Sequence, residues 1–226
     1  MTGKFYVVAT PIGNLEDITL RAVRILGEVD FIFCEDTREG RKLLCRFNIS
    51  KPLDSYHSKS KDYKTDKIIS LLSEGKNVAL ISDAGTPAIS DPGSILVRDL
   101  RERLPEVEIA AVPGPSALTA ALSIAGMPVN VFTFYGFLPH KKGRETLFRL
   151  IAEDDKAAVF YESPHRIMKT FQSLFEHCPE RQVAVARELT KVYEELVRGT
   201  PKEILDRFER APDKIRGEFV IIVSAK

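Results

Sequence analysis

Between an apolar run and an amphipathic run, the chain reads Ser82-Asp83-Ala84-Gly85-Thr86-Pro87-Ala88-Ile89-Ser90-Asp91-Pro92-Gly93. The run before it, residues 77–81, is short and apolar and predicts a strand, while residues 94–103 predict a helix. Residues 82–93, the 82–93 loop, therefore follow the carboxyl end of a strand, where open α/β sheets bind ligands. Its glycines permit close backbone approach, although an ordinary connecting loop has a similar composition.

The composition predicts a globular protein with no overall electrostatic attraction to nucleic acid. The 226 residues are 44% hydrophobic and 29% charged, and 33 Lys and Arg against 32 Asp and Glu give a formal net charge of +1. This length allows one large core or two cores of about 100 residues each. Any contact with RNA must therefore come from local basic clusters.

The cysteines and the N-terminus favour a soluble, cytoplasmic protein without a metal site. Cys34, Cys45 and Cys178 lie far apart with no C-x-x-C spacing, which is typical of free thiols in a reducing compartment. The first residues lack a basic segment followed by a long apolar one, and no apolar run approaches the roughly 20 residues of a membrane span.

Strands and helices alternate in the first half of the sequence. Apolar runs predict strands over 5–9, 31–34, 77–81 and 107–112, and apolar spacing predicts helices over 19–26, near 43–47, near 68–72 and over 94–103. Such alternation predicts a mostly parallel sheet with helices on both faces. Because the turn Pro113-Gly114-Pro115 interrupts the pattern, we expect an N-terminal α/β domain over 1–113 and a C-terminal α/β domain over 114–226.

In the second half the predicted strands outnumber the helices, which favours a mixed sheet. The strands are expected over 131–135, 157–161, 182–186, 193–197 and 219–223. Helices are expected in the Ala-, Leu- and Ile-rich segment that ends near Gly126, after Pro164 and after Thr200-Pro201. Residues 136–144 and 53–64 predict loops. The 53–64 segment mixes aromatic and basic residues, Lys59 among them, and either contacts an RNA backbone and stacks on bases or is a solvated connection.

Several well-known sites are missing from the sequence. It has no G-x-G-x-x-G after the first strand, no G-x-x-x-x-G-K-[ST], no G-x-S-x-G and no H-E-x-x-H, which disfavours the corresponding nucleotide, hydrolase and zinc sites. What remains is a set of polar loops that follow strands, around Pro11, Asp36, Asp83, Gly114, Lys141, Glu162 and Glu188. Gathered at one edge, these loops would line a cleft between the domains.

Five of these segments resemble the tetrapyrrole methylase superfamily. They are Val8-Ala9-Thr10-Pro11-Ile12-Gly13-Asn14-Leu15, Cys34-Glu35-Asp36-Thr37-Arg38, the 82–93 loop, Val112-Pro113-Gly114-Pro115-Ser116-Ala117 and Tyr161-Glu162-Ser163-Pro164-His165-Arg166. The resemblance runs from Tyr6 to about Val223 and implies two α/β domains with a cleft for S-adenosylmethionine (SAM) between them, usually in a homodimer. It also implies methylation of the ribose 2′-hydroxyl of a cytidine in the decoding region of 16S ribosomal RNA, within the small ribosomal subunit.

Carried over position by position, the resemblance predicts the residues that bind the cofactor. They are Pro11, Asp83, Ala84, Gly85, Thr86, Ser116, Ala117, Tyr161, Leu189 and Gly217. Members of the family often continue past the strand at 219–223 with a small helical extension, whereas this sequence ends at Lys226. This difference bears on the expected affinity for RNA.

Methyl transfer to a hydroxyl needs alignment of the reacting atoms and a group that accepts the proton. Glu162 and His165 are the candidate catalytic residues, and the alternative for both is capping the next helix or bracing the loop at Pro164. Cations for the RNA phosphates are sought on the same loops. The candidates are Arg38, Lys141, Lys142, Arg144 and Arg166.

Two other functions stay open at this point. A small-molecule methyltransferase acting on a tetrapyrrole or precorrin-like ring would also use basic loops, because such substrates are rich in carboxylates. The other alternative is a module that binds SAM or RNA without catalysing transfer. Labelled SAM offered together with undermodified ribosomal subunits and a precorrin-type substrate separates the three.

Overall fold

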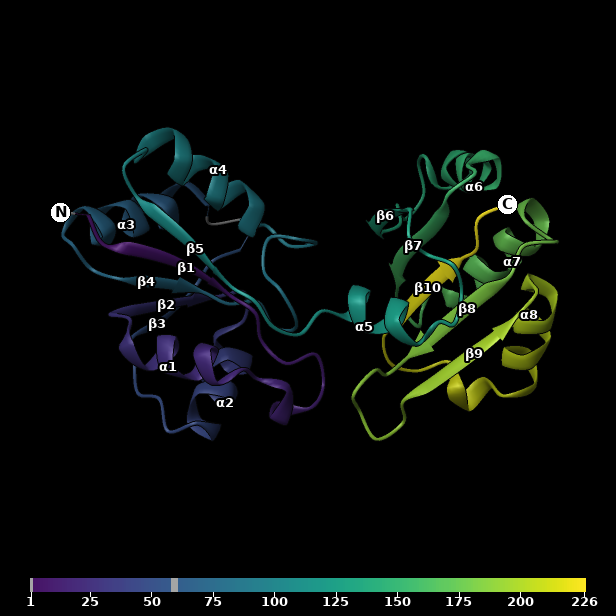
Figure 1. The fold of residues 1–226 in the computed structure, drawn as a ribbon, viewed down its shortest axis with the longest axis horizontal. Coiled ribbons are helices and arrows are strands. Elements are labelled where there is room, and N and C mark those ends of the chain that lie inside the picture. The colour runs from purple at the N-terminus through teal and green to yellow at the C-terminus, as the bar shows by residue number, and fades with distance from the viewer. Residues whose placement is uncertain (1, 58–60) are drawn as a thin grey trace. The chain divides into compact units, whose positions relative to one another are not determined.

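A computed structural model describes residues 2–57 and 61–226 of the chain (Figure 1). The chain forms two compact units, Met1–Ser116 (unit 1) and Ala117–Lys226 (unit 2). Each unit contains a five-stranded sheet with helices packed against it, which confirms the predicted α/β class. Throughout the described ranges, every helix is too short or too polar to cross a membrane.

Unit 1 is built on a parallel sheet. Its strands are β1 (Lys4–Val8), β2 (Phe31–Cys34), β3 (Leu53–Ser55), β4 (Val78–Leu80) and β5 (Glu108–Val112). They lie in the order β3-β2-β4-β1-β5, and each neighbouring pair is parallel. Because all five strands run in the same direction, their carboxyl ends meet at a single edge of the sheet.

Helices cover both faces of this sheet, as Figure 1 shows. They are α1 (Leu20–Glu28), α2 (Thr37–Arg46), α3 (Lys61–Ser73) and α4 (Gly93–Arg103), with a short 3₁₀ turn, η1 (Leu15–Asp17). Side chains alternate along each strand, so Ile32 and Cys34 pack with α1 and α2 while Phe33 packs with α3 and α4. Helix α1 begins after Thr19, whose hydroxyl caps it by accepting the Ala22 N–H at 3.0 Å.

Unit 2 contains the mixed sheet. Its strands are β6 (Phe132–Phe137), β7 (Ala157–Glu162), β8 (Val183–Arg187), β9 (Glu195–Gly199) and β10 (Phe219–Val223). Their order is β6-β7-β10-β8-β9, in which only the β6–β7 pair is parallel. Phe219 at the start of β10 lies opposite both Glu162 and Arg187, so the ends of β7 and β8 reach the same edge of the sheet.

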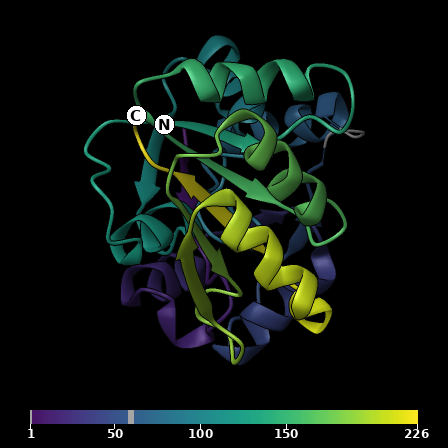
Figure 2. The ribbon, with the colours of Figure 1, turned by 90° about the vertical axis from the view of Figure 1, so that its right-hand side faces the viewer.

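Helices α6, α7 and α8 of unit 2 pack next to one another against its sheet, as can be followed in Figure 2. The helices of this unit are α5 (Ala117–Ile124), α6 (Arg144–Glu153), α7 (Ile167–His177) and α8 (Pro201–Arg210), followed by η2 (Pro212–Lys214). Phe148, Phe171 and Phe208, from α6, α7 and α8, are buried against Phe160 and Phe219 of the strands. Helix α5 contacts β10.

Two segments predicted as loops are regular structure. Within 53–64, residues Leu53–Ser55 form β3 and the last residues open α3, while Lys59 lies outside the described residues. The strand was missed because it is only three residues long and contains a single apolar side chain, Leu53. Its central residue, Asp54, instead binds the ammonium groups of Lys64 at 2.5 Å and Lys67 at 2.8 Å.

The segment 136–144 was also predicted as one loop, and that prediction was wrong at both ends. Gly136 and Phe137 belong to β6, whose pairing with β7 shifts register between Phe134 and Phe137. Arg144 opens α6, a helix that the sequence analysis did not predict. A similar shift affects Arg187, which is the last residue of β8 instead of the first residue of the next loop.

Candidate functional site

Four predicted loops lie together at the carboxyl edge of the unit 1 sheet, and hydrogen bonds join them in pairs. Thr10 and Gly85 form a two-way backbone bridge, with N–O distances of 2.9 and 3.1 Å. The Asp83 carboxylate accepts the Asp36 N–H at 2.9 Å. The Thr86 hydroxyl donates to the carbonyl of Pro115 at 3.1 Å. The 82–93 loop is therefore tied to each of the three loops that follow β1, β2 and β5.

The 82–93 loop holds a backbone shape that most side chains would not permit. Gly85 has φ +80°, and a Cβ added there would lie 3.3 Å from Ile12 Cγ2. Ala88 has φ +69°, an uncommon value for a residue with a side chain. Asp91 holds this conformation, because its two carboxylate oxygens accept the Ala88 N–H at 2.9 and 3.0 Å. Strain that is held in place by surrounding contacts is characteristic of ligand-binding loops.

Carboxylates at this edge raise one another's pKa. Burial raises the pKa of Asp83, and the charges of Asp36 and Glu39 raise it further. Burial and the nearby Asp83 and Asp91 similarly raise the pKa of Glu35. Asp36 differs, since hydrogen bonds from Arg38 lower its pKa to about 2. Burial and neighbouring carboxylates thus disfavour the charged forms of Asp83 and Glu35, and a positively charged ligand would offset that effect.

These features fit the cofactor that the sequence implied. SAM carries a sulfonium and an ammonium group, which would offset the repulsion between these carboxylates, and the bare backbone of Gly85 permits close approach. The predicted residues Pro11, Asp83, Ala84, Gly85 and Thr86 all belong to the loops that the hydrogen bonds join. Ser116 follows Pro115 in the last of these loops, and Ala117 opens α5 of unit 2.

Unit 2 has a second cluster of predicted residues, where β8 ends and β10 begins. Glu188, with φ +51°, accepts the Lys191 ammonium at 2.9 Å and the Glu218 N–H at 3.0 Å. Its own N–H donates to the Glu218 carbonyl at 3.0 Å. These bonds hold two chain segments together, one containing Leu189, which follows Glu188, and the other containing Gly217, which precedes Glu218. A Cβ at Gly217 would clash with the Glu188 carboxylate, and the φ of +83° also favours glycine at that position.

Tyr161, on β7, belongs to an aromatic cluster of the same unit. Its half-buried ring packs edge-on against Phe134 at 5.1 Å and Phe137 at 5.4 Å between ring centroids. Among the described residues this cluster includes the exposed end of β6, since Phe137 is 57% exposed.

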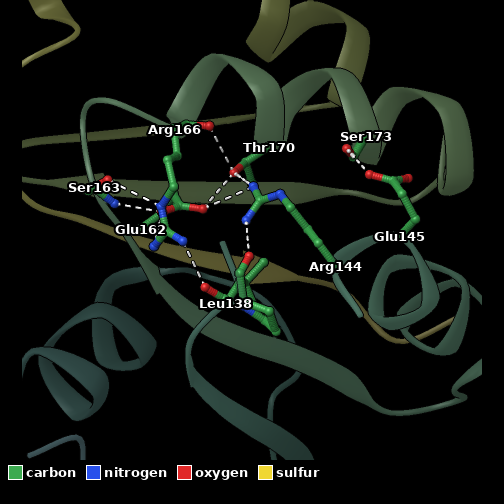
Figure 3. Close-up of polar contacts among 9 residues, drawn as sticks. Leu138, Arg144, Glu145, Glu162, Ser163, Arg166, Thr170 and Ser173 are labelled. Atoms are coloured by element: carbon green, nitrogen blue, oxygen red, sulfur yellow. Dashed lines mark hydrogen bonds and ion pairs between the residues drawn. The ribbon is translucent and has the colours of Figure 1, made fainter. Parts of the chain in front are cut away.

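The two candidate catalytic residues have opposite surroundings. Glu162 has no exposed side-chain surface and binds Arg144 at 3.1 Å and Arg166 at 2.7 Å, as Figure 3 shows. Thr170 donates its hydroxyl to the same carboxylate at 2.8 Å. His165, by contrast, is exposed in the turn before α7. Both roles stay predictions, and only the imidazole of His165 faces solvent.

Exposure divides the candidate RNA-binding cations into two groups. Arg144 is 7% exposed, and Arg166 donates to the carbonyl of Leu138 at 2.8 Å, so both guanidinium groups are engaged inside unit 2. Lys141 and Lys142 are exposed, and neither forms an ion pair within the described part of the chain. Arg38 pairs with Asp36 at 2.6 Å, yet 85% of its side chain is exposed.

Two buried polar residues were missed by the sequence analysis. Thr170 is fully buried and accepts a hydrogen bond from Arg144 at 2.6 Å. Its position four residues after Arg166, on the apolar side of α7, was the available signal. Arg181 is 8% exposed and donates to the carbonyls of Ile151 and Ser224, joining α6 to the end of β10, and no local pattern marks it.

Comparisons with known proteins agree over almost the whole chain. The sequence profile of the tetrapyrrole (corrin/porphyrin) methylases matches residues 4–205. A Thermotoga maritima protein named ribosomal RNA small subunit methyltransferase I is 45% identical, with 99% of each chain covered. A Bacillus subtilis protein of the same name is 44% identical over 98% of this chain and 75% of its own. The crystal structure of a cobalt precorrin-4 methyltransferase matches with a TM-score of 0.71 at 20% identity, covering 98% of this chain and 94% of that one.

Proposed function

The chain belongs to the tetrapyrrole methylase family, and on that premise we propose that it is a SAM-dependent methyltransferase acting on 16S ribosomal RNA. The reaction is 2′-O-methylation of a cytidine ribose in the decoding region of the small ribosomal subunit. The observation that carries this proposal is the full-length identity of 45% to a relative named ribosomal RNA small subunit methyltransferase I. The likeness to the precorrin enzyme, at 20% identity, supports the fold alone.

Residues from both units would hold the cofactor. In unit 1 these are Pro11, Asp83, Ala84, Gly85, Thr86 and Ser116, and in unit 2 they are Ala117, Tyr161, Leu189 and Gly217. Within unit 1, the hydrogen bonds that join the 82–93 loop to the loops after β1 and β5 support this assignment, and within unit 2 Leu189 and Gly217 lie where β8 ends and β10 begins. SAM, when bound, supplies a methyl group on a positively charged sulfur.

The protein's task is to place the ribose oxygen in line with that methyl group and to take the hydroxyl proton. Positioning of the reacting atoms accounts for a large part of such rate enhancements. His165 is the better candidate for the base, because its imidazole is exposed at the end of β7. The phosphates of the RNA would be held by Lys141, Lys142 and Arg38, whose side chains are exposed.

We also propose that the protein acts in the cytoplasm as a homodimer. The family resemblance supports the dimer, and the three separate cysteines, none of them in a disulfide, support a reducing compartment. Sedimentation of the purified protein at micromolar concentration tests the homodimer, and the expected result is a mass near twice 25.3 kDa.

The test of the reaction compares three possible acceptors of the methyl group. Small subunits from a strain that lacks the native enzyme, free 16S RNA and a precorrin-type substrate are incubated separately with labelled SAM. Label in RNA and none in the tetrapyrrole is the expected result. Label in the tetrapyrrole alone would replace the proposal with the small-molecule function, and SAM binding without any transfer would leave a binding module.

A further inference from the structure

We propose that Glu162 is a positioning residue that fixes residues 138–143, the basic loop, for contact with RNA phosphates. The proposal rests on the proposed function. The basic loop connects β6 to α6 and carries the exposed side chains of His140, Lys141 and Lys142. Glu162 reaches the loop through two arginines.

One carboxylate holds both arginines. Arg144 Nη2 lies 3.1 Å from Glu162 Oε2, and Arg166 Nη2 lies 2.7 Å from Glu162 Oε1 (Figure 3). The side chains of Glu162, Arg144 and Arg166 are 0%, 9% and 15% exposed. Because water is largely absent there, each guanidinium depends on this carboxylate for its charge balance. The arginines cannot move outward to a phosphate without leaving Glu162 unpaired.

The other end of each guanidinium holds the basic loop. Arg166 Nη1 donates to the Leu138 carbonyl at 2.8 Å, and Arg144 Nη1 donates to the Pro139 carbonyl at 3.2 Å. The two consecutive carbonyls at the start of the loop are thus linked to one carboxylate on β7. Leu138 is itself 2% exposed, so the start of the loop is anchored by packing as well.

The far end of the basic loop is held by the backbone of Arg144. The Arg144 N–H donates to the Lys141 carbonyl at 3.2 Å, just before α6 begins. The backbone of the loop is therefore fixed on both sides of Lys141 and Lys142, while their ammonium groups remain exposed. Fixing the backbone lowers the entropy lost when these lysines bind a phosphate chain.

The same contacts argue against Glu162 as the catalytic base. Its Oε1 accepts the Ser163 N–H at 2.8 Å in addition to Arg166, and its Oε2 accepts the Thr170 hydroxyl at 2.8 Å in addition to Arg144. A carboxylate offers about four acceptor positions, and all four are used here. A ribose hydroxyl would have to displace one of these donors to give up its proton to Glu162.

The first experiment measures the loop directly, without RNA. Trypsin cleaves after Lys141 and Lys142, and its rate there reports how often the basic loop opens. We expect Glu162→Gln to raise this rate about tenfold relative to the remaining sites, under conditions where circular dichroism shows the variant to be folded. Glu145→Gln is the matched control, because Glu145 pairs with His177 at 3.1 Å on the same helix pair without touching the loop.

The second experiment measures RNA binding in a double-mutant cycle. Lys141→Ala with Lys142→Ala should reduce the slope of log affinity against log salt by about 1.5 to 2. In the wild-type background, Glu162→Gln should reduce the affinity for small subunits by about the same factor as the double-lysine change does. In the double-lysine variant, Glu162→Gln should reduce that affinity by less than twofold. The affinity for SAM, measured without RNA, should be retained.

Contrary results are equally specific. Unchanged cleavage at Lys141 and Lys142 in Glu162→Gln overturns the positioning role, as does an additive loss of RNA affinity in the cycle. Loss of kcat with unchanged affinity identifies Glu162 as a base. A wild-type protein that binds subunits but methylates nothing refutes the proposed function alone, because the cleavage and binding results do not depend on transfer.

Discussion

Replacing Gly85 by alanine tests whether the 82–93 loop binds SAM. The residue has φ +80°, and the new Cβ would lie 3.3 Å from Ile12 Cγ2 and 3.7 Å from the Pro115 carbonyl oxygen. A left-handed alanine costs about 1–2 kcal/mol. The loss of chain entropy in the unfolded state offsets about 0.4–1 kcal/mol of this. With a few tenths added for the close Ile12 contact, roughly 1 kcal/mol of stability should be lost.

Two measurements follow from this estimate. Thermal unfolding followed by circular dichroism should show a midpoint lowered by about 2–4 °C, the shift expected per kcal/mol for a chain of this length. Calorimetric titration should show SAM affinity reduced at least tenfold, or about 1.4 kcal/mol, because the methyl group occupies the bare backbone that the cofactor approaches.

Two other glycines give matched controls. Gly27, exposed in α1, has no atom within 4 Å of an added Cβ, so Gly27→Ala should stabilise the helix by about 0.5–1 kcal/mol and leave SAM binding unchanged. Gly143 has φ +85° and also no atom within 4 Å, so Gly143→Ala adds the backbone strain without touching the proposed pocket. Wild-type SAM affinity in Gly85→Ala would refute the location of the pocket, and a raised midpoint would refute the backbone argument.

Three further predictions concern unit 1. Thr86→Val removes the 3.1 Å hydrogen bond to Pro115, so urea unfolding should show a free energy of unfolding lowered by about 0.5–1.5 kcal/mol, and the affinity for SAM should also fall. If both values are unchanged, this bond does not hold the two loops together. Burial raises the pKa of Asp54, but hydrogen bonds from two lysines bring it down to about 2, so this carboxylate stabilises the fold above about pH 4 and its contribution is lost as the pH falls toward 2. Asp54→Asn should therefore be less stable than the wild type at pH 7 and lose less stability between pH 4 and pH 2. A parallel decline of the two proteins would contradict the ion pairs. Burial raises the pKa of Cys34 to about 12, with nearby aspartates adding to the effect. At pH 8 a disulfide reagent should therefore modify the exposed Cys45 rapidly and Cys34 only on unfolding. Rapid modification of Cys34 in the folded protein would contradict its burial.

The sequence was most informative where neighbouring residues decide the structure. The 82–93 loop follows an apolar strand and precedes an amphipathic helix, so its place at the edge of a parallel sheet follows from the alternation of elements. Its hydrogen-bond partners do not follow in the same way. Asp36 and Asp83 are 47 residues apart, and only the β2–β4 pairing brings their loops together.

The basic run near Arg144 shows the opposite case. Lys141, Lys142 and Arg144 read alike in the sequence, yet the two lysines are exposed and the arginine is 7% exposed. What separates them is α6, whose buried Phe148 and Ile151 turn the first residue of the helix toward Glu162. Had the helical spacing of these apolar residues been recognised, the burial of Arg144 would have been predictable.

Methylation of assembled small subunits, followed by mapping of the modified nucleotide, tests the central claim most directly. Subunits from a strain without the native enzyme are treated with the protein and SAM, and the RNA is then cleaved by alkali, which spares a bond next to a 2′-O-methyl group. The account predicts one protected position, at a cytidine of the decoding region, in subunits treated with wild-type protein and a strongly reduced signal with Gly85→Ala. Methyl groups on a base, or protection outside the decoding region, would contradict it.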